Sequence, residues 1–370
     1  MKKIFTFMML VLAAVIIAAC NKSNSPAPGN PTTVTSQILY FPPVSGTWTT
    51  TTAASLGWNT AGLNDLNTYL QSVGTKAFII LKDGKIVTEQ YYGSFTADSA
   101  CYWDSAGKTV TGFLVGIAQT QNLVNINNSV SSYIGKGWTS ETTAQESAIT
   151  VKNLLSMTSG LNDNIQPNNY STLPGSFTYL APAGARWAYH TGAYTILDSV
   201  LEKTSGLSFN TYFQQNLANK IGMSGLWYKV PNANNILYSN ARSMARFGLL
   251  MLAKGKWDNQ VILSDTNYFN AQVNTSQNYN LSYGYLTWLN GKASEMLPGF
   301  QTVAPTDVIP NGPNDMFMAL GKNDQKVYVV PSQNLVVIRM GNSVGGVSLA
   351  QSDFDNTLWG KLKSIIGYTN

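Results

Sequence analysis

The sequence predicts an α+β fold, with one antiparallel sheet built from both chain ends, flanked by helices and carrying a mostly helical inserted domain. Runs rich in β-forming residues lie at 76–92 and again at 316–340, whereas helical patterns dominate from about residue 105 to 255. Strands at both ends with helices between them are typical of a sheet layer that carries a helical insertion. The chain has 370 residues, of which 44% are hydrophobic, so it can bury a large core.

Spacing and turn chemistry predict the individual elements. In residues 60–73, three leucines recur at helical spacing. A β-hairpin is expected next, because the runs 76–82 and 85–92 enclose an Asp-Gly pair, the strongest short hairpin signal. The other predicted helices span residues 105–119, 150–157, 192–203, 208–218, 239–254 and about 348–366, and the other predicted strands span 316–320, 326–330 and 335–340.

The N-terminal residues are typical of an exported lipoprotein. Lys2 and Lys3 precede a run from residue 4 to 19 that is apolar apart from one threonine, as in a signal peptide. The run ends in Ile-Ala-Ala and is followed by Cys20, which resembles a bacterial lipobox. We expect removal of residues 1–19, acylation of Cys20 and anchoring in the cell envelope, on the periplasmic side of a bacterial membrane or at the cell surface. The alternative is an ordinary signal peptide followed by an incidental cysteine.

After the anchor, residues 20–55 are rich in Ser, Thr, Asn and Pro, and they are predicted to form a flexible tether. Residues 56–370 are predicted to form the folded domain, with the helical insertion at about 105–255. If Cys20 carries lipid, Cys101 is the only remaining thiol and no intrachain disulfide can form. We expect Cys101 to fill the core.

Composition excludes several classes of function. Charged residues make up only 11% of the chain, and the net charge of +5 falls to +3 when Lys2 and Lys3 leave with the signal peptide. A basic field for nucleic acid is therefore not expected. His190 is the single histidine, so zinc sites with several histidine ligands cannot form. We expect no metal and no cofactor.

A pair of chemically active residues opens the first helix of the insertion. Ser105 and Lys108 form the only Ser-x-x-Lys pattern in the chain. A serine at a helix N-terminus lies at the positive end of the helix dipole, and a lysine three residues later lies on the same face. This is the arrangement of a nucleophile and its base, provided that desolvation lowers the pKa of the lysine. The alternative is a capping serine followed by a solvated lysine.

Further motifs follow in a characteristic order. They are ITVKNLLSMTSGL at 149–161, WAYHTGAY at 187–194, ARSMARFGLLMLAKGKW at 241–257, YGY at 283–285 and ALG at 319–321. This series resembles the serine beta-lactamase and penicillin-binding protein superfamily on its class C side. It is most similar to the branch with esterases and 6-aminohexanoate-dimer hydrolases, over about residues 60–368. The resemblance implies a beta-lactamase/transpeptidase-like fold.

The resemblance also assigns roles to particular residues. It implies that Ser105 is the acylated nucleophile and Lys108 its general base. Tyr189 matches the tyrosine of the family's Tyr-x-Asn motif, which passes a proton to the leaving group. The oxyanion hole would consist of the backbone N–H groups of Ser105 and Lys322. Gly321 would then lie on the strand that borders the substrate.

Several positions depart from the family pattern. Ala319 replaces the cation that normally binds a penicillin carboxylate, and Thr191 replaces the asparagine that contacts the substrate amide. Asp324 stands where relatives often have glycine, which leaves the shape of that turn open. His190 matches the variable middle residue of Tyr-x-Asn, and the chain has no Gly-x-Ser-x-Gly elbow, so we expect a spectator or substrate-contact role rather than a base.

Together these observations predict a serine hydrolase that cleaves an ester or small amide through an acyl-enzyme on Ser105. Its partner would be a small ester, amide or short peptide. One alternative is a class C beta-lactamase or a D-alanyl carboxypeptidase, which Ala319 makes less favourable. The other is a non-catalytic lipoprotein that binds a glycan or peptide, suggested by the aromatic and Asn-rich composition.

Overall fold

The computed structural model describes residues 39–164, 169–346 and 351–369. The predicted signal peptide, Cys20 and residues 20–38 of the predicted tether lie outside the described residues and stay predictions. Within the described ranges, no helix combines the length and apolar character needed to cross a membrane.

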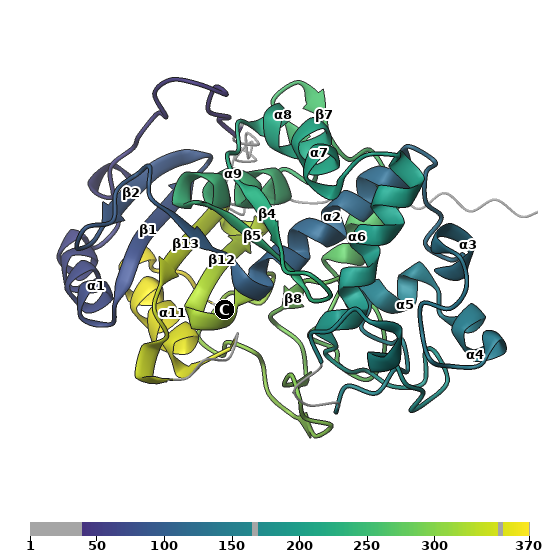
Figure 1. The fold of residues 1–370 in the computed structure, drawn as a ribbon. Coiled ribbons are helices and arrows are strands. Elements are labelled where there is room, and N and C mark those ends of the chain that lie inside the picture. Colours follow the sequence, from purple (N-terminus) through teal and green to yellow (C-terminus); the bar gives the residue numbers. More distant parts are fainter. Residues whose placement is uncertain (1–38, 165–168, 347–350, 370) are drawn as a thin grey trace, which may run out of the picture. The chain divides into compact units, whose positions relative to one another are not determined.

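A six-stranded sheet joins the two ends of the chain, and its order is β2-β1-β13-β12-β11-β8 (Figure 1). Every neighbouring pair is antiparallel, and Ile79 of β1 lies opposite Ile338 of β13. The predicted α+β architecture is therefore confirmed. The strands are β1 (Thr75–Lys82), β2 (Lys85–Tyr91), β8 (Trp288–Leu289), β11 (Phe317–Gly321), β12 (Gln325–Val330) and β13 (Leu335–Gly341).

Helices cover both faces of this sheet. On one face lies α9 (Ala241–Leu252), where Gly248 approaches the sheet so closely that a Cβ there would meet a Val336 methyl group at 2.5 Å. On the other face lies α11 (Asp353–Ile366), whose Trp359 ring contacts Tyr328 of β12. Successive strand residues point to opposite faces, which is why Tyr328 and its neighbour Val327 contact different helices. Helix α1 (Thr60–Ser72) packs beside α11.

The region between the terminal strands is mostly helical. Its central helix, α2 (Gly107–Thr120), is buried from Gly107 to Ala118 and contacts α6, α10 and β11. A helix that is apolar on all sides belongs in an interior. The other helices are α3 (Ser131–Ile134), α4 (Thr143–Ala148), α5 (Val151–Leu155), α6 (Thr191–Ser205), α7 (Phe209–Phe213), α8 (Asn219–Ile221) and α10 (Thr266–Gln272).

A small sheet that the sequence did not predict also lies in this region. Its order is β3-β5-β4, with β3 (Ala100–Tyr102), β4 (Leu226–Lys229) and β5 (Asn235–Asn240). Further two-stranded pairs are β6 (Lys256–Trp257) with β7 (Gln260–Val261), and β9 (Glu295–Met296) with β10 (Val303–Ala304).

Several predicted helix boundaries differ from the structure by a few residues, and three examples follow. The helix predicted over 239–254 begins at residue 241, because the Asn240 side chain accepts a hydrogen bond from Ser243 N and caps it. The segment 208–218 divides into α7 and a π-helical turn, η4 (Gln214–Ala218). The last helix begins at residue 353, because Ser352 and Asp355 form a capping box.

The predicted tether is also too long. The indole of Trp48 is buried and donates a hydrogen bond to Gly84 O at 2.8 Å, and Thr51 N donates to Ile86 O. Residues 39–55 therefore belong to the folded domain, where they contact the hairpin β1–β2 and also Arg246 and Trp257. The tether prediction remains only for residues 20–38.

Candidate active site

Ser105 lies in a tight turn between the small sheet and the central helix. The turn, η2 (Asp104–Ala106), is separated from β3 by Trp103 alone and leads into α2. Trp103 anchors its start, because its backbone N–H donates to Leu237 O and its indole N–H donates to Ser239 Oγ. Asp104 has a φ of 50°, which is rare for a residue other than glycine. The chain thus turns sharply just before Ser105.

Lys108 contacts Ser105 directly. Its Nζ lies 2.8 Å from Ser105 Oγ, and the side chain is only 2% exposed. Two aromatic rings border the amine, with the Nζ 4.9 Å from the centre of Tyr189 and 4.4 Å from that of Tyr194. Burial lowers the pKa of Lys108 to about 7, although the nearby Asp104 carboxylate acts in the opposite direction. A large fraction of Lys108 is therefore neutral at neutral pH and can accept a proton.

Tyr189 is the third member of the group. Its ring is stacked on Trp288 with centres 6.0 Å apart, and it contacts the Tyr283 ring edge-on. Burial raises the pKa of Tyr189, and a hydrogen bond with the Ser105 side chain lowers it to a smaller extent. The hydroxyl therefore keeps its proton near neutral pH. The structure brings Ser105, Lys108 and Tyr189 together, as the sequence predicts.

His190 caps a helix and makes no hydrogen bond to Ser105 among the described contacts. Its Nδ1 accepts a hydrogen bond from Ala193 N at 3.2 Å at the start of α6, and its ring contacts Phe177. Burial lowers the pKa of His190 to about 4, and only 1% of the residue is exposed. The imidazole is therefore neutral, and the Nδ1 lone pair is used by the helix. Thr191 is the first residue of α6 and is likewise buried.

Strand β11 ends against the Ser105 turn. A Cβ at Gly321 would lie 2.2 Å from Trp103 O and 3.0 Å from Ala106 N, so only glycine fits there. Lys322 follows with an exposed side chain and begins the turn η5 (Lys322–Asp324). Ala319 is buried on β11 and offers no charge. The backbone segments that carry the predicted oxyanion-hole amides are thus in direct contact, while the oxyanion hole itself stays a prediction.

Sequence reasoning assigned no role to three aromatic residues of the site. Tyr194 lies against the Lys108 amine, while Tyr283 and Trp288 enclose the Tyr189 ring. All three lie in or just after the motifs at 187–194 and 283–285, and this position in the motifs was the only sequence feature that pointed to them. Their function could not be inferred, because their contacts join segments that are distant in the sequence.

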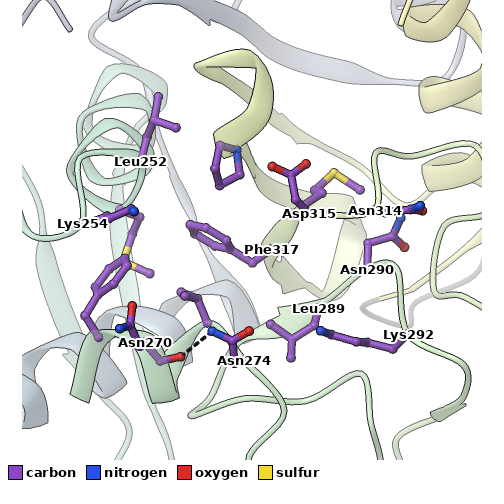
Figure 2. A pocket seen from close by; sticks show the side chains of 15 residues that line it. Leu252, Lys254, Asn270, Asn274, Leu289, Asn290, Lys292, Asn314, Asp315 and Phe317 are labelled. Atoms are coloured by element: carbon purple, nitrogen blue, oxygen red, sulfur yellow. Dashed lines mark hydrogen bonds between the residues drawn. The ribbon is translucent and has the colours of Figure 1, made fainter. Parts of the chain in front are cut away.

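A separate cavity of about 470 Å³ lies at the opposite end of β11 from Gly321 (Figure 2). Phe317, Leu289 and Leu252 form part of its wall, and Lys254 and Lys292 lie on opposite sides of it. None of the predicted site residues lines this cavity. In the described part of the chain, no three His, Cys, Asp or Glu side chains are grouped closely enough to hold a metal ion.

The fold and the buried Ser–Lys pair define a protein of the serine beta-lactamase and penicillin-binding protein superfamily. The chain belongs to the beta-lactamase family, whose model matches residues 68–358. It is therefore a member of a hydrolase family.

Individual relatives are distant. One relative is a Bacillus subtilis (strain 168) protein that carries the name penicillin-binding protein PbpX. The two sequences are 25% identical over 177 residues, and the alignment covers 43% of each chain. The chain thus spans less than half the length of that relative. Its fold resembles a Bacillus anthracis protein that carries the name 6-aminohexanoate-dimer hydrolase, with a TM-score of 0.66, 18% identity and 88% of each chain covered. It also resembles EstCE1, a hydrolase with promiscuous acyltransferase activity, with a TM-score of 0.63, 13% identity and coverage of 84% of this chain and 99% of that one.

The low pKa of Lys108 leads to a prediction about stability. The pKa of the Lys108 amine is 10.5 in the unfolded chain and about 7 in the folded chain. Between these pH values the unfolded state therefore binds more protons than the folded state. The free energy of unfolding of the wild type consequently rises with pH in this range. Lys108→Met removes the buried amine and should raise the free energy of unfolding at pH 7 by about 1–4 kcal/mol. Urea unfolding should show that this gain shrinks toward pH 10.

Lys326 is the matched control. It is also fully buried, but its Nζ contacts Asp355 at 2.8 Å and Asp324 at 3.2 Å. Lys326→Met leaves two buried carboxylates without this cation and should lower stability by about 3–5 kcal/mol. Equal losses in both variants would contradict the contrast between the two lysines.

Proposed function

We propose that the protein is a serine hydrolase that cleaves an ester or a small amide through an acyl-enzyme on Ser105. One observation carries the proposal: Lys108 Nζ lies 2.8 Å from Ser105 Oγ in surroundings that lower the pKa of the amine to about 7. A weakly basic, neutral amine at hydrogen-bond distance is what a serine hydroxyl needs for activation. The membership of the beta-lactamase family supports the same reading.

In the proposed mechanism, neutral Lys108 accepts the hydroxyl proton of Ser105 while Oγ attacks the carbonyl carbon of the substrate. The N–H groups of Ser105 and Lys322 stabilise the resulting oxyanion. Tyr189 donates its proton to the leaving oxygen or nitrogen and is reprotonated by Lys108. The bond to the leaving group then breaks and the acyl group remains on Ser105. Water releases the acyl group by the same steps in reverse.

The surroundings of β11 favour uncharged acyl groups. Ala319 occupies the position from which a cation would bind a penicillin carboxylate, and it is buried. Thr191 has a side chain shorter than the asparagine that contacts the substrate amide in relatives. We therefore place esters and small amides ahead of beta-lactams and D-alanyl peptides as substrates.

Covalent labelling tests the proposal directly. A fluorophosphonate probe should form one adduct per chain, detected by intact-mass analysis, because its phosphorus is attacked by an activated serine hydroxyl. The adduct should be absent in Ser105→Ala. Ser159→Ala is the matched control, because Ser159 is another buried serine and its hydroxyl accepts a hydrogen bond from Leu161 N. An adduct that survives Ser105→Ala would overturn the assignment.

The pH dependence of acylation separates Lys108 from His190 as the base. The rate of acylation by a p-nitrophenyl ester should rise with pH through about 7, because Lys108 must lose its proton before it can accept another. This inflection should persist in His190→Asn, whose new side chain can still cap α6. Tyr189→Phe should lower kcat by roughly 10²-fold or more, the scale of general acid–base catalysis.

Pre-steady-state kinetics on these variants provides the measurement. Tyr283→Phe is the control for Tyr189→Phe, since it removes a phenol hydroxyl from the ring packed against Tyr189, and it should keep most of the activity. Loss of acylation in His190→Asn, together with near-normal Tyr189→Phe, would assign the base to His190.

Substrate preference provides a further test. Short-chain p-nitrophenyl esters should be cleaved well and chromogenic cephalosporins poorly, because a missing charge-assisted hydrogen bond typically costs about 1.5–3 kcal/mol. The measurement is kcat/KM for both substrate types. Lys322→Ala is the companion variant, since it keeps the backbone amide but removes the exposed cation. Efficient cephalosporin turnover that disappears in Lys322→Ala would show that Lys322 replaces the missing cation.

A further inference from the structure

The turn η5, which carries the Lys322 amide, has an unusual backbone. Asn323 and Asp324 have φ values of 59° and 55°. Two consecutive left-handed residues other than glycine persist only when their surroundings hold them in place. The turn is therefore held by contacts beyond its own sequence.

A buried arginine two strands away supplies these contacts. Arg339 of β13 has no exposed surface, and its Nη1 donates hydrogen bonds to Asn323 O at 3.2 Å and to Asp324 O at 3.0 Å. Its Nε donates to Thr75 Oγ1 at 3.1 Å, which orients the guanidinium. A planar guanidinium presents its donors in a fixed geometry, so it fixes the position of both carbonyls.

The Asp324 side chain is held as well. Its carboxylate accepts hydrogen bonds from Val344 N at 2.8 Å and Ser352 Oγ at 2.7 Å, and it lies 3.2 Å from Lys326 Nζ. The backbone and the side chain of this residue are thus fixed from different sides. A conformation that glycine adopts without steric cost is thus maintained here by the surrounding structure.

The same turn contacts the nucleophile segment. Asn323 Nδ2 donates a hydrogen bond to Asp104 Oδ2 at 3.3 Å, and Gly321 touches Trp103 O so closely that no Cβ fits between them. A shift of the turn therefore moves the Lys322 amide relative to Ser105.

We propose that Arg339 is a positioning residue, which holds the turn so that the Lys322 amide lies beside that of Ser105. This inference rests on the proposed function, because it gives that amide a role in the reaction. Displacement of a catalytic group by about 1 Å can cost roughly 10²-fold in rate.

The test is Arg339→Lys, which keeps the charge but loses the planar fork of donors. The variant and the wild type are treated with excess fluorophosphonate, and both the labelling rate constant and the final labelled fraction are measured. We expect the rate constant to fall about 10- to 100-fold while labelling still reaches completion. A purely structural role would lower the labelled fraction and the melting temperature, and would leave the rate constant unchanged.

Arg246→Lys is the matched control. Arg246 is also a buried arginine that donates to backbone carbonyls, at 2.7 Å to both Ile221 O and Pro43 O, but it does not contact the turn. We expect a loss of stability with an unchanged labelling rate constant. If Arg339→Lys labels to completion at the wild-type rate, the inference is wrong.

Two further results keep the inference separate from the proposed function. If Arg339→Lys does not fold, Thr75→Val is the second variant. It removes the acceptor of the Nε hydrogen bond, while the bonds to Val73 O and Asn342 O remain, and it should slow labelling in the same direction. An unchanged rate contradicts the inference. If wild-type protein forms no adduct on Ser105, the proposed function fails. Normal wild-type labelling together with unaffected variants overturns the inference alone.

Discussion

The burial of the Lys108 amine against Ser105 is the constraint on which the proposed mechanism depends. In that mechanism, an amine at its ordinary pKa would be protonated and could not accept a proton, so the surroundings must disfavour its charge. Burial of α2 on all sides achieves this, and the rings of Tyr189 and Tyr194 border the amine instead of a paired carboxylate.

A second buried lysine has very different neighbours. Lys326 of β12 contacts two carboxylates, with its Nζ 3.2 Å from Asp324 and 2.8 Å from Asp355. Tyr328 donates a further hydrogen bond to Asp355, which ties β12 to α11. The two lysines have the same chemical group and nearly the same exposure. They differ in their neighbours, because two aromatic rings border Lys108, whereas Lys326 is paired with two carboxylates.

Local signals predicted the parts of this molecule that depend on short stretches of sequence. The Asp-Gly hairpin, the closing strands and the Ser105–Lys108 spacing are of this kind. The strand β3 has only three residues, too few for an alternating pattern, and it forms because it pairs with β5 far along the chain. The segment 39–55 resembles a linker in composition, yet Trp48 and its backbone hydrogen bonds tie it to the hairpin. The approach of Tyr189 to Ser105 is tertiary, and only family resemblance could suggest it.

Backbone strain is present on both sides of the contact between two turns. Asp104 precedes Ser105, and Asn323 and Asp324 follow β11, all with positive φ. Such conformations cost about 1–3 kcal/mol each for residues other than glycine. At Asn323 and Asp324 this cost is offset by hydrogen bonds from Arg339, Val344 and Ser352, which belong to the sheet and to the segment before α11. The same turn contacts Asp104 through Asn323 Nδ2, so groups from the C-terminal part of the chain support the backbone next to Ser105.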